Sequence, residues 1–184
     1  MVILMIELGD IKAARDRISE HIRRTPVFPV RNTSLPLGKG ELFLKLECMQ
    51  VTGSFKARGA TNKFLTMPKE AVRNGIVTAS GGNHGIAVAH AATMAGVPAT
   101  VFVPEAVTEE KIARLRQWGA KVVRRGKIWN DSNALALNYA KERNCAYFHP
   151  FADPAVVAGQ GTTALEFLED APTPDVMVVA IGGG

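Results

Sequence analysis

Apolar and polar positions follow two periods along the chain, and these periods predict an alternation of helices and strands. Residues 9–23 place Ile11, Ala14, Ile18 and Ile22 at helical spacing. Further helices are predicted over residues 54–67, 83–95, 108–118, 131–143 and 154–168. Short apolar runs predict strands at 41–46, 75–80, 99–103, 120–124, 146–148 and 175–181. This order is typical of an α/β fold whose parallel strands are joined by right-handed crossovers, and Pro68 and "HPFADP" (149–154) are the expected crossings between two lobes.

Composition and charge restrict which partners and which cellular location are expected. The chain has 184 residues, 47% of them hydrophobic, and a net charge of +5 from 22 basic and 17 acidic residues. The densest basic cluster, "KVVRRGK", lacks interleaved aromatic residues, so no nucleic-acid partner is expected. "MVILMI" is too short for a signal peptide, and the apolar run 86–103 is broken by His90, Gly96 and Pro98, so no membrane span is expected. Two distant cysteines without a CxxC pair favour a reducing compartment, and we expect a cytoplasmic protein.

The stretch "QVTGSFKARGATNKF" (50–64) places Lys56 just after Thr52, Gly53 and Ser54, small polar residues that commonly start helices. The first turn of a helix carries a positive partial charge, which opposes a lysine there. An amine in a positive, partly desolvated site has a lowered pKa and a more accessible neutral form. That property suits a lysine that forms a Schiff base. Most lysines in proteins are simply solvated surface residues. The neighbouring segments therefore decide whether Lys56 is a surface lysine or a Schiff-base lysine.

Two glycine-bearing segments supply that context. "SGGNHG" (80–85) follows a predicted strand and opens a helix, so its backbone N–H groups are suited to an anion. It is not the GxGxxG dinucleotide fingerprint, because position 83 is Asn. The plainer alternative is a strand–turn–helix link with Asn83 as the N-cap. "AIGGG" (180–184) matches a phosphate-cradling turn but has no helix behind it, so we expect the chain to be the front part of something longer.

A lysine amine, a carboxylate site and a phosphate cradle are together what a pyridoxal phosphate enzyme needs. "TGSFKARGA", "SGGNHG", "HPFADPAVVAGQGTTALE" and "AIGGG" resemble the signature segments of the threonine/serine dehydratase and serine racemase group of fold-type II pyridoxal phosphate enzymes. The resemblance covers essentially the whole chain, with its motifs in family order. It implies a two-lobed, three-layer α/β/α architecture like that of the tryptophan synthase β-subunit, of which this chain covers little more than half.

The resemblance also assigns roles to individual residues. Lys56 would hold the cofactor, with Phe55 beside its ring and Asn83 bonded to its phenolic oxygen. Gly182, Gly183 and Gly184 would begin the phosphate loop. The substrate carboxylate would be held by Ser80, Gly81, Asn83 and His84. Residues 1–66 would form the first part of the large domain, 67–152 the small domain, and 153–184 the return into the large domain.

The implied reaction is elimination of the β-hydroxyl of L-threonine or L-serine to give a 2-oxo acid and ammonia. In relatives that racemise serine, the position of Gly81 is a second serine, so we expect elimination without appreciable racemisation. Another β-hydroxy amino acid, such as 3-hydroxyaspartate or a hydroxyectoine breakdown product, stays open as a substrate. So do two rivals. One is a β-replacement synthase, although those usually carry Lys-Asp-Arg instead of "KAR". The other is an inactive fragment.

Remaining residues receive plainer interpretations. The four histidines show no metal-ligand spacing, and no metal is expected. Arg58 is interpreted either as support for the site or as part of a surface or inter-element ion pair. Relatives are often dimers or tetramers, so a homo-oligomer is expected of the full-length protein.

Overall fold

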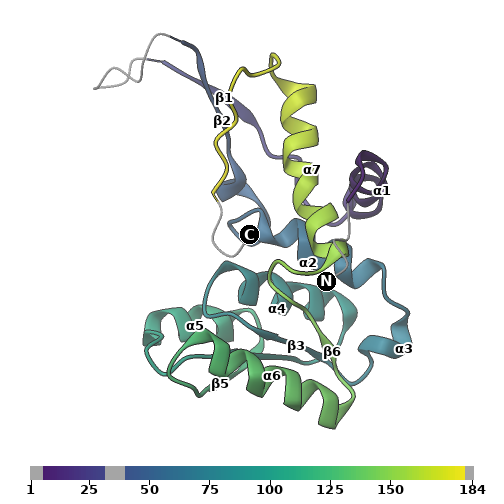
Figure 1. Cartoon of the computed structure of the whole chain (residues 1–184), viewed down its shortest axis with the longest axis vertical. Helices are drawn as coiled ribbons and strands as arrows, with labels where there is room; N and C mark the ends of the chain where they lie inside the picture. The colour runs from purple at the N-terminus through teal and green to yellow at the C-terminus, as the bar shows by residue number, and fades with distance from the viewer. Residues whose placement is uncertain (1–5, 32–39, 181–184) are drawn as a thin grey trace.

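A computed structural model describes residues 6–31 and 40–180, and its elements fall into two groups around two sheets (Figure 1). The strands are β1 (Val27–Val30), β2 (Leu42–Lys45), β3 (Ile76–Ala79), β4 (Ala99–Val103), β5 (Ala120–Arg124) and β6 (Ala146–Tyr147). The helices are α1 (Leu8–Ile18), the 3₁₀ turn η1 (Glu47–Met49), α2 (Lys56–Leu65), α3 (Lys69–Val72), α4 (Asn83–Ala95), α5 (Glu109–Gln117), α6 (Trp129–Arg143) and α7 (Pro154–Asp170). The mixed α/β class is confirmed.

The larger sheet is fully parallel, with strand order β5-β4-β3-β6. Alternation of side chains along β4 builds its two cores. Val101 and Val103 face the layer that contains α4 and α5, whereas Phe102 faces α6. The sheet is therefore covered on both faces, as parallel sheets require, and Figure 1 shows α4 and α6 on opposite sides of it.

The second group of elements contains α1, α2, α7 and the antiparallel ribbon β1–β2. Helices α2 and α7 cross so closely that a β-carbon on Gly159 would lie 2.7 Å from the Arg58 carbonyl oxygen and 2.7 Å from the Gly59 α-carbon. Helix α2 also packs on α4 of the parallel layer. Because α2 contacts both groups, its first residue, Lys56, lies where they meet.

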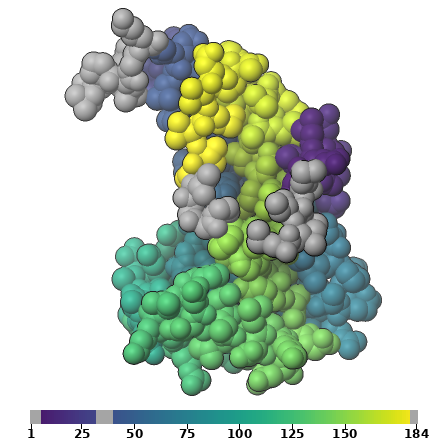
Figure 2. Space-filling view, in the orientation of Figure 1, coloured from purple at the N-terminus to yellow at the C-terminus, as the bar shows by residue number. Residues whose placement is uncertain are grey.

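The strand predicted at 175–181 is absent from the described part of that range. Residues 175–180 form no strand, and Val176 and Val178 are 77% and 92% exposed. Figure 2 shows the end of the described chain, in yellow, at the surface of the molecule. An apolar run becomes a strand only when another strand takes its backbone hydrogen bonds, and none does so within the described residues.

Strand β1 and its antiparallel pairing with β2 were not expected either. Pro29 argues against a strand at this place, because proline has no N–H to donate to a ladder. An edge position explains the proline, since among the strands of the described residues β1 pairs with β2 alone.

A candidate active site at the carboxyl edge of the parallel sheet

The chain segments after β3 and β6 lie together, because neighbouring parallel strands end at the same edge of a sheet. Residues 80–82 follow β3 and lead into α4, and residues 148–151 follow β6. Thr78 on β3 donates from its Oγ1 to the Phe148 carbonyl oxygen at 2.7 Å. The glycine loop and "HPF" are thereby fixed side by side.

Lys56 is the first residue of α2 and reaches this edge. Its half-buried amine donates to the Pro150 carbonyl oxygen at 3.1 Å and lies 5.0 Å from the centre of the Phe55 ring. Burial lowers the pKa of Lys56, the direction that the sequence argument predicts. The small polar residues before the helix do not cap it: the N-cap is Phe55, while the Thr52 and Ser54 hydroxyls are buried without a partner among the described residues.

The loop of residues 80–82 opens helix α4 without a side-chain cap. Gly82 is the N-cap and Asn83 is the first helical residue, so the alternative that Asn83 caps the helix is wrong. The first helical hydrogen bond runs from the Ile86 amide to the Gly82 carbonyl at 3.3 Å. The amides of residues 83–85 precede that bond and form a positive helix end at the sheet edge. Asn83 itself is exposed, and Ser80 and Gly81 are half-buried.

The side chain of His84 contacts the segment after β6. It is buried, and its Nε2 lies 3.3 Å from the Phe148 carbonyl oxygen. A carbonyl only accepts, so Nε2 carries the proton and Nδ1, which has no partner among the described residues, is an acceptor. Burial, with a smaller contribution from the nearby Lys56 charge, lowers the pKa of His84 to about 3, so the ring is neutral. A neutral ring offers no positive charge to a substrate carboxylate. The part of His84 that is suited to bind an anion is therefore its backbone amide.

Arg58, two residues after Lys56, belongs to an ion-pair network between elements, as one of its two interpretations predicted. It is fully buried and donates to Glu166 on α7 at 2.7 and 2.8 Å and to Glu47 on η1 at 2.8 and 2.9 Å. Lys45 on β2 also contacts Glu166 at 2.8 Å. The network locks the start of α2 against α7 and the ribbon.

Sequence reasoning did not find Pro150, whose carbonyl accepts a hydrogen bond from Lys56, or His149, whose ring accepts from the amides of the loop that follows it. Both belong to "HPFADP", which was expected to be a crossing between two lobes and resembled part of a signature segment but received no role in the site, although its position directly after a strand was an available signal. Gly182, Gly183 and Gly184 lie outside the described residues. Among the described residues, no three His, Cys, Asp or Glu side chains are close enough to hold a metal ion.

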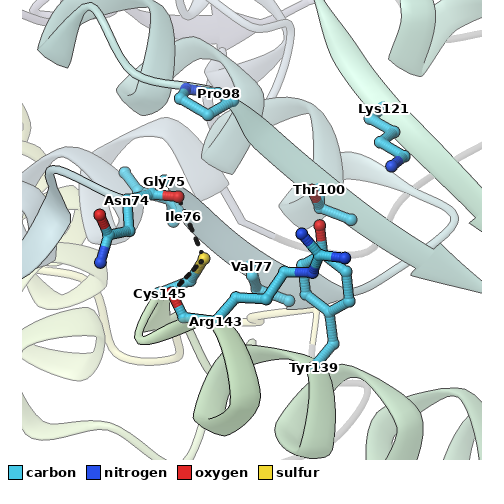
Figure 3. A pocket seen from close by; sticks show the side chains of 10 residues that line it. All are labelled: Asn74, Gly75, Ile76, Val77, Pro98, Thr100, Lys121, Tyr139, Arg143 and Cys145. Carbon is cyan, nitrogen blue, oxygen red and sulfur yellow. Dashed lines mark hydrogen bonds between the residues drawn. The ribbon is translucent and has the colours of Figure 1, made fainter.

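A cavity of about 440 Å³ lies at the opposite edge of the sheet, where the strands begin (Figure 3). Figure 3 shows Cys145 hydrogen-bonded to the Asn74 carbonyl and Arg143 beside Tyr139. The cavity is lined by Asn74, Gly75, Ile76, Val77, Pro98, Thr100, Lys121, Tyr139, Arg143 and Cys145. None of the residues expected to hold cofactor or substrate lines it, so it is separate from the Lys56 site.

Comparison with known proteins identifies the class that this fold and site define. Residues 18–184 match the family model described as "Pyridoxal-phosphate dependent enzyme", and the chain belongs to that family. Over 180 residues it is 42% identical to the L-threonine dehydratase catabolic TdcB of Staphylococcus aureus strain USA300, covering 98% of this chain and 52% of that relative. The chain thus spans about half the length of the curated relatives it matches.

Two solved structures share the fold at substantial identity. A threonine deaminase from T.th. superposes with a TM-score of 0.81 at 43% identity, covering 89% of this chain and 51% of that one. A pyridoxal 5'-phosphate-dependent aspartate racemase superposes with a TM-score of 0.85 at 38% identity, covering 94% and 54%. The expected resemblance to threonine/serine dehydratases and to fold-type II architecture is confirmed.

Proposed function

We propose that this chain carries the amine and the substrate-binding loop of a pyridoxal phosphate-dependent ammonia-lyase that acts on L-threonine or L-serine. The observation that carries the proposal is the Lys56 amine, which is half-buried, has a lowered pKa and lies at the carboxyl edge of the sheet. Relatives at 42% identity named threonine dehydratase support this substrate class.

The residues present fit the cofactor. A lysine with a lowered pKa suits an aldehyde, and the Thr52 and Ser54 hydroxyls before it in the chain are buried polar groups without a partner among the described residues. We assign Lys56 to the aldehyde, Phe55 to the ring face and Asn83 to the phenolic oxygen. We assign Gly182, Gly183 and Gly184 to the phosphate.

When bound, pyridoxal phosphate supplies an electron sink that stabilises negative charge at the substrate α-carbon. The chain's own residues perform the proton transfers and the orientation. The freed amine of Lys56 takes the α-proton, and burial favours this role because it lowers the pKa of Lys56 and so favours the neutral form. The uncapped start of α4 holds the carboxylate through Ser80, Gly81 and the backbone amides of Asn83 and His84.

Elimination without racemisation is supported by the environment of Gly81. Glycine has no hydroxyl with which to move a proton on the second face of the substrate. A β-carbon there would lie 2.9 and 3.2 Å from the two methyl carbons of Val107, so the loop leaves little room for a serine. Chiral chromatography after incubation with L-serine tests this point, and rapid appearance of D-serine would contradict it.

The remaining assignments concern the whole protein. We propose a cytoplasmic enzyme that forms a homo-oligomer when full length, with the domain division 1–66, 67–152 and 153–184. No helix in the described part of the chain has the length and apolar character needed to cross a membrane.

The proposed activity is tested by supplying the chain with pyridoxal phosphate and L-threonine and measuring 2-oxo acid and ammonia. Equal amounts of both, absent in Lys56→Ala, are the expected result. Cofactor binding without product would overturn the activity of this chain while leaving its cofactor assignment intact. The alternative substrate class, another β-hydroxy amino acid, is tested by the same assay with 3-hydroxyaspartate.

A further inference from the structure

The partner of the Lys56 amine is a backbone carbonyl that its neighbours hold in place. Lys56 Nζ donates to the Pro150 oxygen at 3.1 Å, and the two residues are 94 positions apart in sequence. The Pro150 carbonyl shares its peptide plane with the N–H of Phe151, so whatever holds that N–H also sets the direction of the oxygen. The direction of this carbonyl therefore depends on the residues on either side.

On the N-terminal side, the Phe148 carbonyl is fixed by two donors, Thr78 Oγ1 at 2.7 Å and His84 Nε2 at 3.3 Å. On the C-terminal side, the ring of His149 closes a turn. Its Nδ1 accepts from the Phe151 amide at 3.2 Å and from the Ala152 amide at 2.8 Å. These bonds bracket Pro150 and set where its oxygen points.

The His149 ring is held in the required state. Because Nδ1 accepts two N–H bonds, it carries no proton, and the proton of the neutral ring is on Nε2. Trp129, Tyr147 and Phe151 contact the ring edge-on or nearly so, with centroid distances of 6.0, 6.2 and 4.5 Å. Burial lowers the pKa of His149, although Asp153 opposes this, and the neutral form is favoured.

We propose that His149 is a positioning residue that holds the Pro150 carbonyl against the amine of Lys56 while that amine is free. The inference rests on the proposed function of Lys56 and adds a role for a residue that does not touch substrate. The free amine is the form that takes the α-proton, so the carbonyl fixes its position during that step.

The test compares His149→Asn with His149→Leu in the chain without cofactor. Asparagine accepts from the amides two and three residues ahead in the same way as His149 Nδ1, whereas leucine fills similar space without an acceptor. The pKa of Lys56 is measured by trace acetylation between pH 7 and 11 with mass spectrometry, and the exposed Lys111 on α5 is the internal control.

In His149→Leu the pKa of Lys56 should fall by roughly half a unit or more, because the ammonium form loses a well-placed acceptor while the amine stays half-buried. In His149→Asn it should stay at the wild-type value. An unchanged or raised pKa in His149→Leu, or an equal fall in both variants, would overturn the proposal. If His149→Leu does not fold, long-range ¹H–¹⁵N spectra of the wild-type chain decide: a protonated Nδ1 overturns it and an unprotonated Nδ1 supports it. These readouts need no cofactor, so they are independent of whether the chain proves to be an ammonia-lyase.

Discussion

Arg58 on α2 and Glu166 on α7 form a buried, two-pronged ion pair with N–O distances of 2.7 and 2.8 Å. Burial alone would raise the pKa of Glu166, but hydrogen bonds from Arg58 and Lys45 outweigh it and lower that pKa. Arg58 follows Lys56 by two residues on the same helix, so the pair fixes the end of the helix that carries the amine.

Removing one partner of this pair should cost far more than removing a surface partner. Glu166→Ala leaves Arg58 buried with Glu47 as its one remaining carboxylate and takes from Lys45 its partner at 2.8 Å, and we expect a loss of about 3–5 kcal/mol in the free energy of unfolding. The control is Glu169→Ala, which removes exposed contacts to Arg15 and Arg24 and should cost less than about 1 kcal/mol. Urea unfolding followed by circular dichroism measures both. Equal losses would show that the buried pair has no special role.

The close crossing of α2 and α7 predicts a strong response at Gly159. A β-carbon there would meet backbone atoms of Arg58 and Gly59 at 2.7 Å, and backbone cannot move aside as a flexible side chain can. Gly159→Ala should therefore destabilise the chain by about 1–3 kcal/mol or more. Gly9→Ala is the matched control, since no atom lies within 4 Å of its added carbon, and it should be neutral or slightly stabilising. A neutral Gly159→Ala would mean that the helices are further apart.

Acid should destabilise the fold through His84. Its pKa is about 3 in the folded chain because of burial, against an ordinary value of 6.5. The unfolded chain therefore binds more protons between these values, and stability falls as pH falls from about 6.5 towards 3, by at most about 1.4 kcal/mol per unit. Glutamine keeps a donor for the Phe148 carbonyl without titrating. In His84→Gln the drop in urea midpoint between pH 7.5 and 5 should shrink, and an undiminished drop would exclude His84 as its source.

The sequence predicted those parts of the fold that depend on local pattern. The glycine loop, α4 and the strand before it follow from an apolar run, a turn and helical spacing, and all three were expected at nearly their observed positions. The lysine at a helix start was expected from the residues around it. These signals lie within a few residues of one another, which is why one sequence is enough to find them.

What could not be predicted depends on contacts between distant residues. Nothing near Lys56 in sequence indicates that Pro150 would accept from it, and the partners of Arg58 are set by the crossing of α2 and α7. The segment 175–180 shows the reverse case, since its apolar pattern is that of a strand while its backbone has no strand partner among the described residues. An apolar pattern gives a segment a tendency to form a strand, but whether the strand forms depends on pairing with another strand.

Gly81 and Val107 should behave as a coupled pair. Gly81→Ser alone places a β-carbon 2.9 Å from a Val107 methyl carbon, so we expect it to lower the free energy of unfolding by about 1–3 kcal/mol. Gly81→Ser/Val107→Ala removes the clash and should be less destabilised than the sum of the single variants. Additive losses in urea unfolding would show that Val107 does not limit this position.

The central claim is that Lys56 is the residue that bonds to pyridoxal phosphate, and reduction with borohydride followed by peptide mapping tests it most directly. The chain is incubated with the cofactor and reduced, and the modified lysine is identified by mass spectrometry. Lys63, further along α2 and paired with Asp153 at 2.9 Å, is the matched comparison. We predict modification of Lys56 and its loss in Lys56→Ala but not in Lys63→Ala. Modification of a different lysine, or none at all, would contradict the account.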